Sequence, residues 1–194
     1  MARPREFDEG VVLEHALRAF WLHGYEGTTL QNLMAATGLN KSSLYKTFGS
    51  KDDLFLKVVD LYHDRYLSFR EDALGQPTPR IIVEHLLRGI VALQSGEDTP
   101  PGCLITNSAL VCSSGGERMR TLLVRRRQSF EPRLEARFAQ LDWEKKLPSG
   151  MTCQDAAALV GVLINGLAVQ AKSGSSRSEL ERVVLISMLF WPQD

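Results

Sequence analysis

Apolar residues recur every three or four positions along nearly the whole chain of 194 residues. That spacing places them on one face of an α-helix, whereas a half-buried strand needs strict alternation, and no convincing run of alternation occurs. We therefore predict an all-α protein of about nine helices. The expected helices cover residues 8–23, 29–38, 41–48, 51–73, 79–95, 103–111, 116–143, 152–172 and 178–190.

Capping residues and glycines set the limits of the first four helices. Asp8 is the expected cap of the first helix and Gly24 its stop, while Asn40 caps the third helix and Gly49 closes it. Ser50 and the acid three residues later form a capping-box pattern that starts the fourth helix at once. Further along, Pro132 is expected to interrupt or kink the helix 116–143.

Composition excludes several classes of protein. Lysine plus arginine and aspartate plus glutamate are both 23, so the net charge is zero and bulk charge points neither to nucleic acid nor to acidic lipid. The three cysteines form no C-x-x-C pair, which predicts neither a disulfide framework nor a zinc site. The first residues lack the apolar core of a secretory signal, and the longest apolar stretch, 156–171, is interrupted by Asn165 and Gln170. We expect a cytoplasmic protein without a membrane span.

The parts of an enzyme are missing from the sequence. Its four histidines have no spacing to carboxylates that fits a metal motif, and there is no G-x-S-x-G, P-loop or G-x-G-x-x-G. We therefore predict no catalytic residues, no metal and no cofactor.

The most informative segment is 28–55, TTLQNLMAATGLNKSSLYKTFGSKDDLF. It predicts two short helices joined by a glycine-containing turn, the helix-turn-helix arrangement whose second helix enters a major groove. That second helix carries two lysines, two serines and a tyrosine, all hydrogen-bond donors, and no carboxylate lies between Ala35 and Ser50. A helical hairpin with a solvated polar face would give a similar pattern, so the spacing alone leaves both open.

The same residues also resemble a known family. Phe20, Gly24, Tyr25, Thr28 and Thr29, followed by ATGLNKSSLYKTFGSKDDLF, are similar to the amino-terminal DNA-binding domain of TetR-family transcriptional repressors over about residues 11–55. The resemblance implies a helix-turn-helix domain at 1–50 and an effector-binding and dimerisation domain at 51–194, connected by a long helix 51–73. It also implies a homodimer on a palindromic double-stranded DNA operator.

Site residues carry over from the family position by position. The resemblance assigns phosphate contacts to Thr28, Thr29, Tyr45 and Lys51, and base-reading contacts to Lys41, Ser42, Ser43 and Lys46. Many family members have histidine where this chain has Thr47, so that contact is not carried over.

The helix 152–172 is apolar nearly all round and must be covered on more than one side. In a chain this short a second copy can supply that cover, and the resemblance likewise implies dimerisation through the last two helices. The candidate interface residues are Leu159, Leu163, Leu167, Val183 and Phe190.

The resemblance implies a small-molecule effector bound in the carboxy-terminal domain. Candidate lining residues are Tyr62, Tyr66, Leu86, Cys103, Asn107, Met119 and Phe130. Cys103 permits two interpretations, a buried core cysteine or a reactive thiol.

We interpret the chain as a dimeric repressor that leaves its operator when an effector binds. Two alternatives stay open at this point: a helical dimeric adaptor without DNA binding, and a repressor that senses oxidants or electrophiles through Cys103. Operator binding separates the adaptor from the other two.

Overall fold

A computed structural model describes residues 7–110 and 117–192 of the chain. These residues form eleven α-helices and two short 3-10 helices and contain no strand, which confirms the all-α prediction. The expected loop at 113–117 and the expected helix limits at Val111 and Gly116 lie outside, or on the border of, the described residues. The helices are α1 (Glu9–Gly27), α2 (Leu30–Thr37), α3 (Lys41–Phe48), α4 (Lys51–Tyr66), α5 (Phe69–Leu74), α6 (Pro79–Gln94), α7 (Leu104–Leu110), α8 (Glu117–Gln128), α9 (Glu131–Gln140), η1 (Trp143–Lys146), α10 (Cys153–Lys172), α11 (Arg177–Ser187) and η2 (Met188–Phe190).

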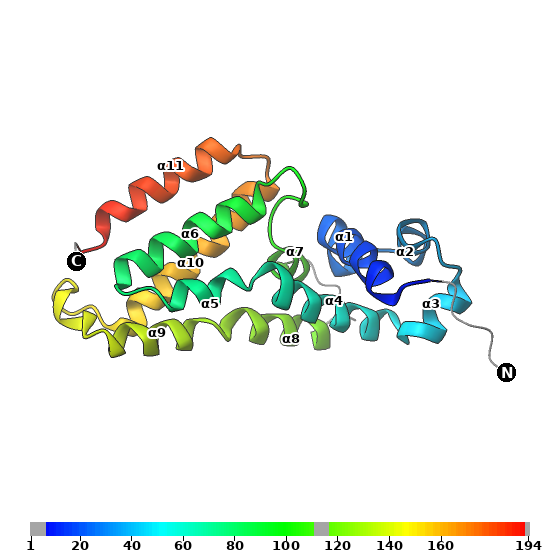
Figure 1. The fold of residues 1–194 in the computed structure, drawn as a ribbon, viewed down its shortest axis with the longest axis horizontal. Helices are drawn as coiled ribbons and strands as arrows, with labels where there is room; N and C mark the ends of the chain where they lie inside the picture. Colours follow the sequence, from blue (N-terminus) through cyan, green and yellow to red (C-terminus); the bar gives the residue numbers. More distant parts are fainter. Residues whose placement is uncertain (1–6, 111–116, 193–194) are drawn as a thin grey trace.

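The molecule is elongated. Helices α1, α2 and α3 lie at one end, α6, α10 and α11 lie at the other, and α4 runs from the first group toward the second (Figure 1). Helices α8 and α9 follow one long side, and α7 lies where the two groups meet (Figure 1).

The predicted length of the fourth helix is wrong. It was expected to reach residue 73, but α4 ends at Tyr66, and Leu67 leaves helical geometry at φ −107° and ψ 6° before α5 begins at Phe69. No glycine or proline marks this break, so its cause is packing. Leu67 is buried in the amino-terminal core, while the Phe69 ring lies against Gly89 of α6, where an added Cβ would be 2.5 Å from the ring.

The helix predicted from residue 116 to 143 is likewise divided. Helix α8 ends at Gln128 and α9 begins at Glu131, so the interruption lies just before Pro132 rather than at it. Proline fits the first turn of a helix, where its missing N–H has no partner to lose, and Pro132 occupies that turn of α9. A second break at Asp142, which has a left-handed φ of 54°, separates α9 from η1.

Buried side chains form two clusters rather than one. One cluster joins α6, α9, α10 and α11, and it holds Trp143 and Trp191 stacked at 5.4 Å between ring centroids. The other cluster joins α1 to α4 with α7, α8 and Ala168 of α10. The amino-terminal helices therefore share their core with elements much later in the chain.

Helix α7 and its preceding loop are tied to the end of α1 by hydrogen bonds. The indole Nε1 of Trp21 donates to the carbonyl of Gly102 at 2.7 Å, and both residues are buried. The backbone N–H of Tyr25 donates to Ser108 Oγ at 3.2 Å, and Lys172 Nζ of α10 donates to the carbonyl of Leu22 at 2.6 Å. These bonds hold the first helix against the carboxy-terminal half.

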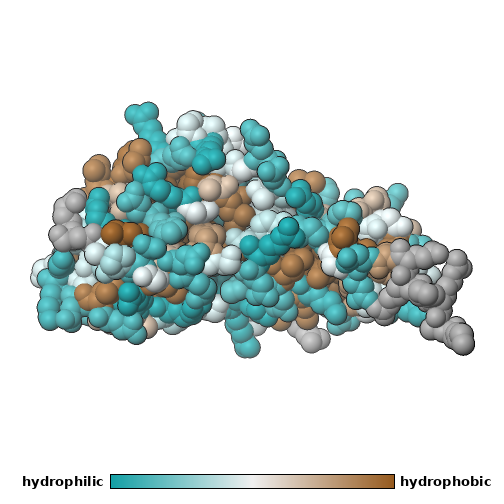
Figure 2. Space-filling view, viewed as in Figure 1, coloured by the Kyte–Doolittle hydropathy of each residue, from teal (hydrophilic) through white to brown (hydrophobic). Residues whose placement is uncertain are grey.

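An apolar groove of about 530 Å³ lies on the outer face of α10 and α11. Its walls include Leu159, Leu163, Val183 and Phe190, and Phe190 is 76% exposed. Hydrophobic side chains reach the surface at the end of the molecule that holds α11 (Figure 2). Leu167, by contrast, is only 3% exposed and packs within the protomer, so the prediction that placed it in a dimer interface does not fit its burial.

Among the described residues, one helix has the length and apolarity of a membrane span. This helix is α10, at 20 residues and a mean hydropathy of 1.3, and 44% of its apolar window is buried inside the protein. A core helix of a soluble protein meets the same criteria, and α10 packs against α6 and α9.

We predict that Trp21→Phe destabilises the protein by about 1–3 kcal/mol, because the buried Gly102 carbonyl loses its donor. Trp143→Phe is the matched control, since the Trp143 Nε1 is buried with no hydrogen-bond partner in the described part of the chain and the same atoms are removed. Urea unfolding at equal protein concentration measures both variants. Equal losses in the two would contradict a special role for the Trp21 bond.

Candidate nucleic-acid interface and effector cavity

Each of the helices α2, α3 and α4 starts on a side-chain cap. Thr29 and Asn32 form a reciprocal capping box at α2, with the Asn32 N–H 3.1 Å from Thr29 Oγ1. Asn40 Oδ1 accepts the Ser43 N–H at 2.9 Å at the start of α3. Gly38, at φ 70°, ends α2 in the left-handed conformation and so makes the tight turn between the two helices. The predicted starts of α2 and α3 are confirmed.

The buried side of α3 fixes its orientation. Leu44 and Phe48, one turn apart, are 2% and 4% exposed and belong to the amino-terminal core with Leu33 of α2. The opposite side is therefore turned to solvent. Lys41, Ser42, Tyr45 and Lys46 are exposed there, and Ser43 is half-buried.

The exposed side of α3 carries positive charge only. No carboxylate occurs between Thr28 and Ser50, and neither Lys41 nor Lys46 has a salt bridge among those of the described residues. Lys46 also lies in the last turn of α3, where the helix dipole favours a cation. The face is thus a surface of cations, hydroxyls and one phenol, all donors to an anionic partner.

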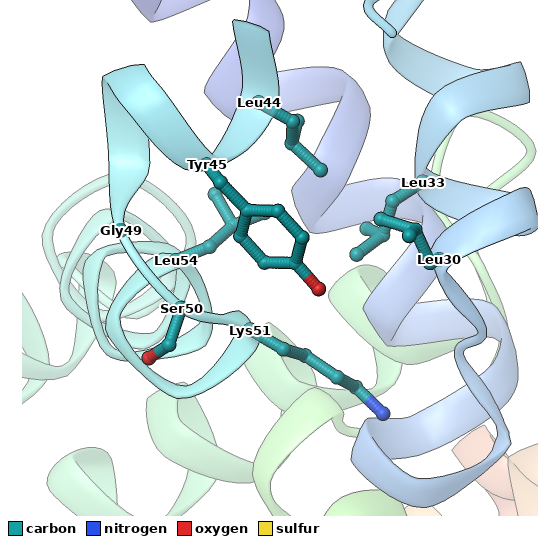
Figure 3. A pocket seen from close by; sticks show the side chains of 8 residues that line it. All are labelled: Leu30, Leu33, Leu44, Tyr45, Gly49, Ser50, Lys51 and Leu54. Carbon is teal, nitrogen blue, oxygen red and sulfur yellow. The ribbon is translucent and has the colours of Figure 1, made fainter. Parts of the chain in front are cut away.

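Tyr45 and Lys51 project from different helices toward the same side (Figure 3). Their side chains line a small hollow floored by Leu33, Leu44 and Leu54. Lys51 Nζ lies 4.5 Å from the centroid of the Tyr25 ring, and burial lowers the pKa of Lys51 while Glu26 and Asp52 raise it.

Thr28 does not belong to this surface. It is completely buried, and its hydroxyl donates to the Gly24 carbonyl at 2.6 Å, which closes the turn after the irregular Gly24. Thr29 is exposed, but its hydroxyl is occupied by the cap on Asn32. We therefore leave Thr28 out of the interface proposed below.

A second candidate site is a partly enclosed cavity where α7, α9 and α10 meet the start of α5. We call it the Cys103 cavity. Its volume of about 30 Å³ has room for about two water molecules. It is lined by Leu67, Arg70, Cys103, Ile105, Thr106, Arg127, Phe130, Glu131, Gly161, Ile164 and Asn165.

Two of the seven predicted effector-pocket residues, Cys103 and Phe130, line this cavity. Tyr62 adjoins it, because its hydroxyl donates to Cys103 Sγ at 3.6 Å, and burial raises the pKa of Tyr62 well above its usual range.

The other four lie elsewhere. Met119 packs in the amino-terminal core and Leu86 in the carboxy-terminal one. Asn107 Nδ2 is 3.5 Å from the Trp21 carbonyl, and the hydroxyl of Tyr66 bonds Glu14.

Arg70, Thr106 and Asn165 line the cavity but were not predicted. Asn165 could have been found, since it is a polar interruption in an apolar helix and points inward. Nothing in the sequence separates Arg70 from the exposed charges around it. Among the described residues, no group of three or more histidine, cysteine, aspartate or glutamate side chains is placed to hold a metal ion.

Comparison with known proteins identifies the family of the segment that contains α1 to α3 and the first half of α4. Residues 12–58 match the family model described as "Bacterial regulatory proteins, tetR family". A curated relative is the HTH-type transcriptional repressor ComR of Escherichia coli, 28% identical over 193 residues that cover 98% of this chain and 92% of ComR.

Solved structures extend the similarity to the whole fold. The regulator CifR, in a cysteine mutant complexed with 26-base-pair operator DNA, is 33% identical with a TM-score of 0.91, covering 98% of this chain and 100% of that one. A TetR regulator from Rhodococcus sp. RHA1 is 36% identical with a TM-score of 0.62, covering 95% of this chain and 99% of that one.

We predict that Gly49→Ala destabilises the start of α4. Gly49 has φ 83° and ψ −143°, a region open almost only to glycine at a cost of about 1–3 kcal/mol for other residues. An added Cβ would also lie 2.6 Å from Asp53 Oδ2, the atom that accepts the Ser50 N–H and hydroxyl. Thermal unfolding and hydrogen exchange at the Asp53 amide measure the effect.

Gly38→Ala is the matched control for this change. Gly38 also has a positive φ, of 70°, but no atom lies within 4 Å of an added Cβ. It should lower stability less and leave exchange at Asp53 unaltered. The role given to the Ser50–Asp53 cap is wrong if both variants accelerate that exchange equally.

Proposed function

Because this chain belongs to the TetR family of bacterial transcriptional regulators, we propose that it represses transcription from a palindromic operator as a homodimer and leaves it when a small effector binds. It is a DNA-binding regulator and not an enzyme. The observation that carries the proposal is the outer face of α3, where cations and hydroxyls project from a capped, core-anchored helix with no acid among them.

Within this interface the residues divide by role. Lys41, Ser42, Ser43 and Lys46 project from α3 and would read base edges in the major groove. Tyr45 and Lys51, side by side at the junction of α3 and α4, would bind phosphate oxygens, and the exposed Thr29 at the start of α2 would lie against the backbone.

Two copies would meet through α10 and α11. Leu159, Val183 and Phe190 are 39%, 45% and 76% exposed, and with Leu163 they line the apolar groove on that face. Exposed apolar side chains in such number on one face are typical of an interaction surface. A twofold dimer would place its two α3 helices on successive major-groove faces about 34–36 Å apart.

Effector release needs a physical connection between the cavity and α3, and α7 offers one. Cys103 lines the cavity, and the carbonyl of the preceding residue, Gly102, accepts the hydrogen bond from the Trp21 indole N–H of α1. An effector that displaces α7 would therefore shift α1 and the helices packed on it. Helix α4 connects the two domains over a shorter distance than the predicted helix 51–73 would, since it ends at Tyr66.

We divide the chain into a DNA-binding domain at 1–50 and an effector and dimerisation domain at 51–194, and we place the protein in the cytoplasm, where its operator is. Membership of the family argues against the adaptor without DNA binding. The thiol-sensing repressor keeps one supporting observation, the position of Cys103 at the cavity beside the Tyr62 hydroxyl.

We expect Lys51→Ala to weaken binding to an operator selected from random duplexes and to random duplex itself by the same factor. Its phosphate contact carries no sequence information, and its loss should reduce the salt slope by about 1. Lys46→Ala should cost the operator about 1–3 kcal/mol more than random duplex. Fluorescence anisotropy at two salt concentrations separates the two.

Lys145→Ala, in η1 at the far end of the molecule, is the control and should change neither affinity. If Tyr45→Phe, Lys46→Ala and Lys51→Ala together leave operator affinity unchanged, the helix-turn-helix assignment is wrong.

The double variant Leu159→Glu, Val183→Glu should yield folded monomers, because it places two charges on the α10–α11 face without disturbing the protomer core. Val11→Glu, at a 52% exposed position on α1, should remain dimeric. Sedimentation with a circular-dichroism check of helicity measures this. A stable dimer after the double change would place the interface elsewhere.

A further inference from the structure

We propose that the Cys103 cavity binds the carboxylate of a small amphipathic organic acid and that Arg70 is its counter-charge. The inference rests on the proposed function, because it names the chemical class of the effector. It starts from Arg70, a half-buried cation for which the described residues provide no ion pair.

Arg70 is half-buried at the cavity, and its Nε has neither solvent exposure nor a hydrogen-bond partner among the described residues. Burial lowers the pKa of Arg70, and the groups that act against this are Cys103 and Tyr62, not a carboxylate. An unpaired buried cation is strongly unfavourable, so interiors rarely hold one without an anion beside it. Among the described residues, no ion pair joins Arg70 to a carboxylate.

The neutral polar groups of the cavity are already engaged. Asn165 Nδ2 donates to the Gly161 carbonyl at 2.8 Å, and its Oδ1 accepts the Thr106 hydroxyl at 3.4 Å. Cys103 Sγ accepts the Tyr62 hydroxyl. The donors of the lining without a hydrogen bond among the described residues belong to Arg70 and Arg127, and two cations point to an anion rather than to a neutral polar ligand.

The charged side chains that line the cavity carry a net positive charge. Arg127, near the end of α8, and Glu131, the first residue of α9, both border the cavity. Glu131 lies over Gly161, where an added Cβ would be 2.5 Å from its Oε1. Two arginines face one glutamate. An anionic ligand would therefore meet net attraction.

The walls favour an organic acid over an inorganic ion. Leu67, Ile105 and Ile164 are apolar, and Phe130 lies under Arg70 with its ring centroid 5.0 Å from the guanidinium carbon. This cation–π contact restrains the guanidinium, and its planar fork of donors matches the two oxygens of a carboxylate. Because the cavity has room for about two water molecules, these apolar walls would have to separate to accept the rest of the molecule.

Calorimetric titration with hexanoate, hexanamide and inorganic phosphate tests the proposal on the full-length protein. Hexanoate should bind at least about tenfold more tightly than hexanamide, because a hydrogen bond to a charged group is at stake. Arg70→Met should abolish that preference, and Arg70→Lys, which keeps the charge but not the fork, should keep part of it. Arg88→Met, an exposed arginine on α6, should leave it intact.

Equal binding of acid and amide, or binding of neither, would overturn the proposal, as would phosphate binding as tightly as hexanoate. An acid preference that is unchanged in Arg70→Met would assign the carboxylate to the other cation of the lining, Arg127, and would likewise overturn the role given to Arg70. Measuring operator binding with and without hexanoate separates ligand binding at this cavity from the effector role proposed for it. If hexanoate binds through Arg70 but does not release the operator, the site stands and the effector function given to it fails.

Discussion

The hydrogen bond between the Trp21 indole and the Gly102 carbonyl joins the two halves of this protein. It connects residues 81 positions apart at 2.7 Å in a buried setting, so neither group can exchange its partner for water. The Tyr25 and Lys172 bonds on either side repeat the connection through different elements. The direction in which α3 faces is therefore set by the docking of α1 on α7, not by the helix-turn-helix alone.

In the DNA-binding end, local capping determines where the helices begin, and tertiary packing determines which way they face. The caps at Thr29, Asn40 and Ser50 fix where three short helices begin, within a few residues of sequence. Leu44 and Phe48 then decide which side of α3 is hidden. Since the buried residues of α3 are both apolar, its polar residues are left exposed or half-buried. A chain of zero net charge therefore presents a locally cationic face.

What could be predicted from the sequence follows the same division. The starts of α2, α3 and α4 and the outward face of α3 were predicted correctly, because caps and periodicity are local signals. The break at Leu67 was not, since no local residue demands it and the packing of Phe69 on Gly89 does. The burial of Leu167 and the inward position of Arg70 escaped for the same reason, since Leu167 packs with α6 and Arg70 with Phe130. The burial of Thr28 escaped as well, although its hydroxyl bonds locally, to the Gly24 carbonyl.

The small size of the Cys103 cavity also bears on how fast the protein can respond. A space for about two water molecules cannot admit a larger molecule until its walls separate, so entry has to wait for a spontaneous opening. The rate of capture would then reach a ceiling set by that opening rather than rise without limit with concentration, and the walls that admit a ligand would also retain it. A regulator built this way reports a sustained presence of its ligand and filters out brief exposure.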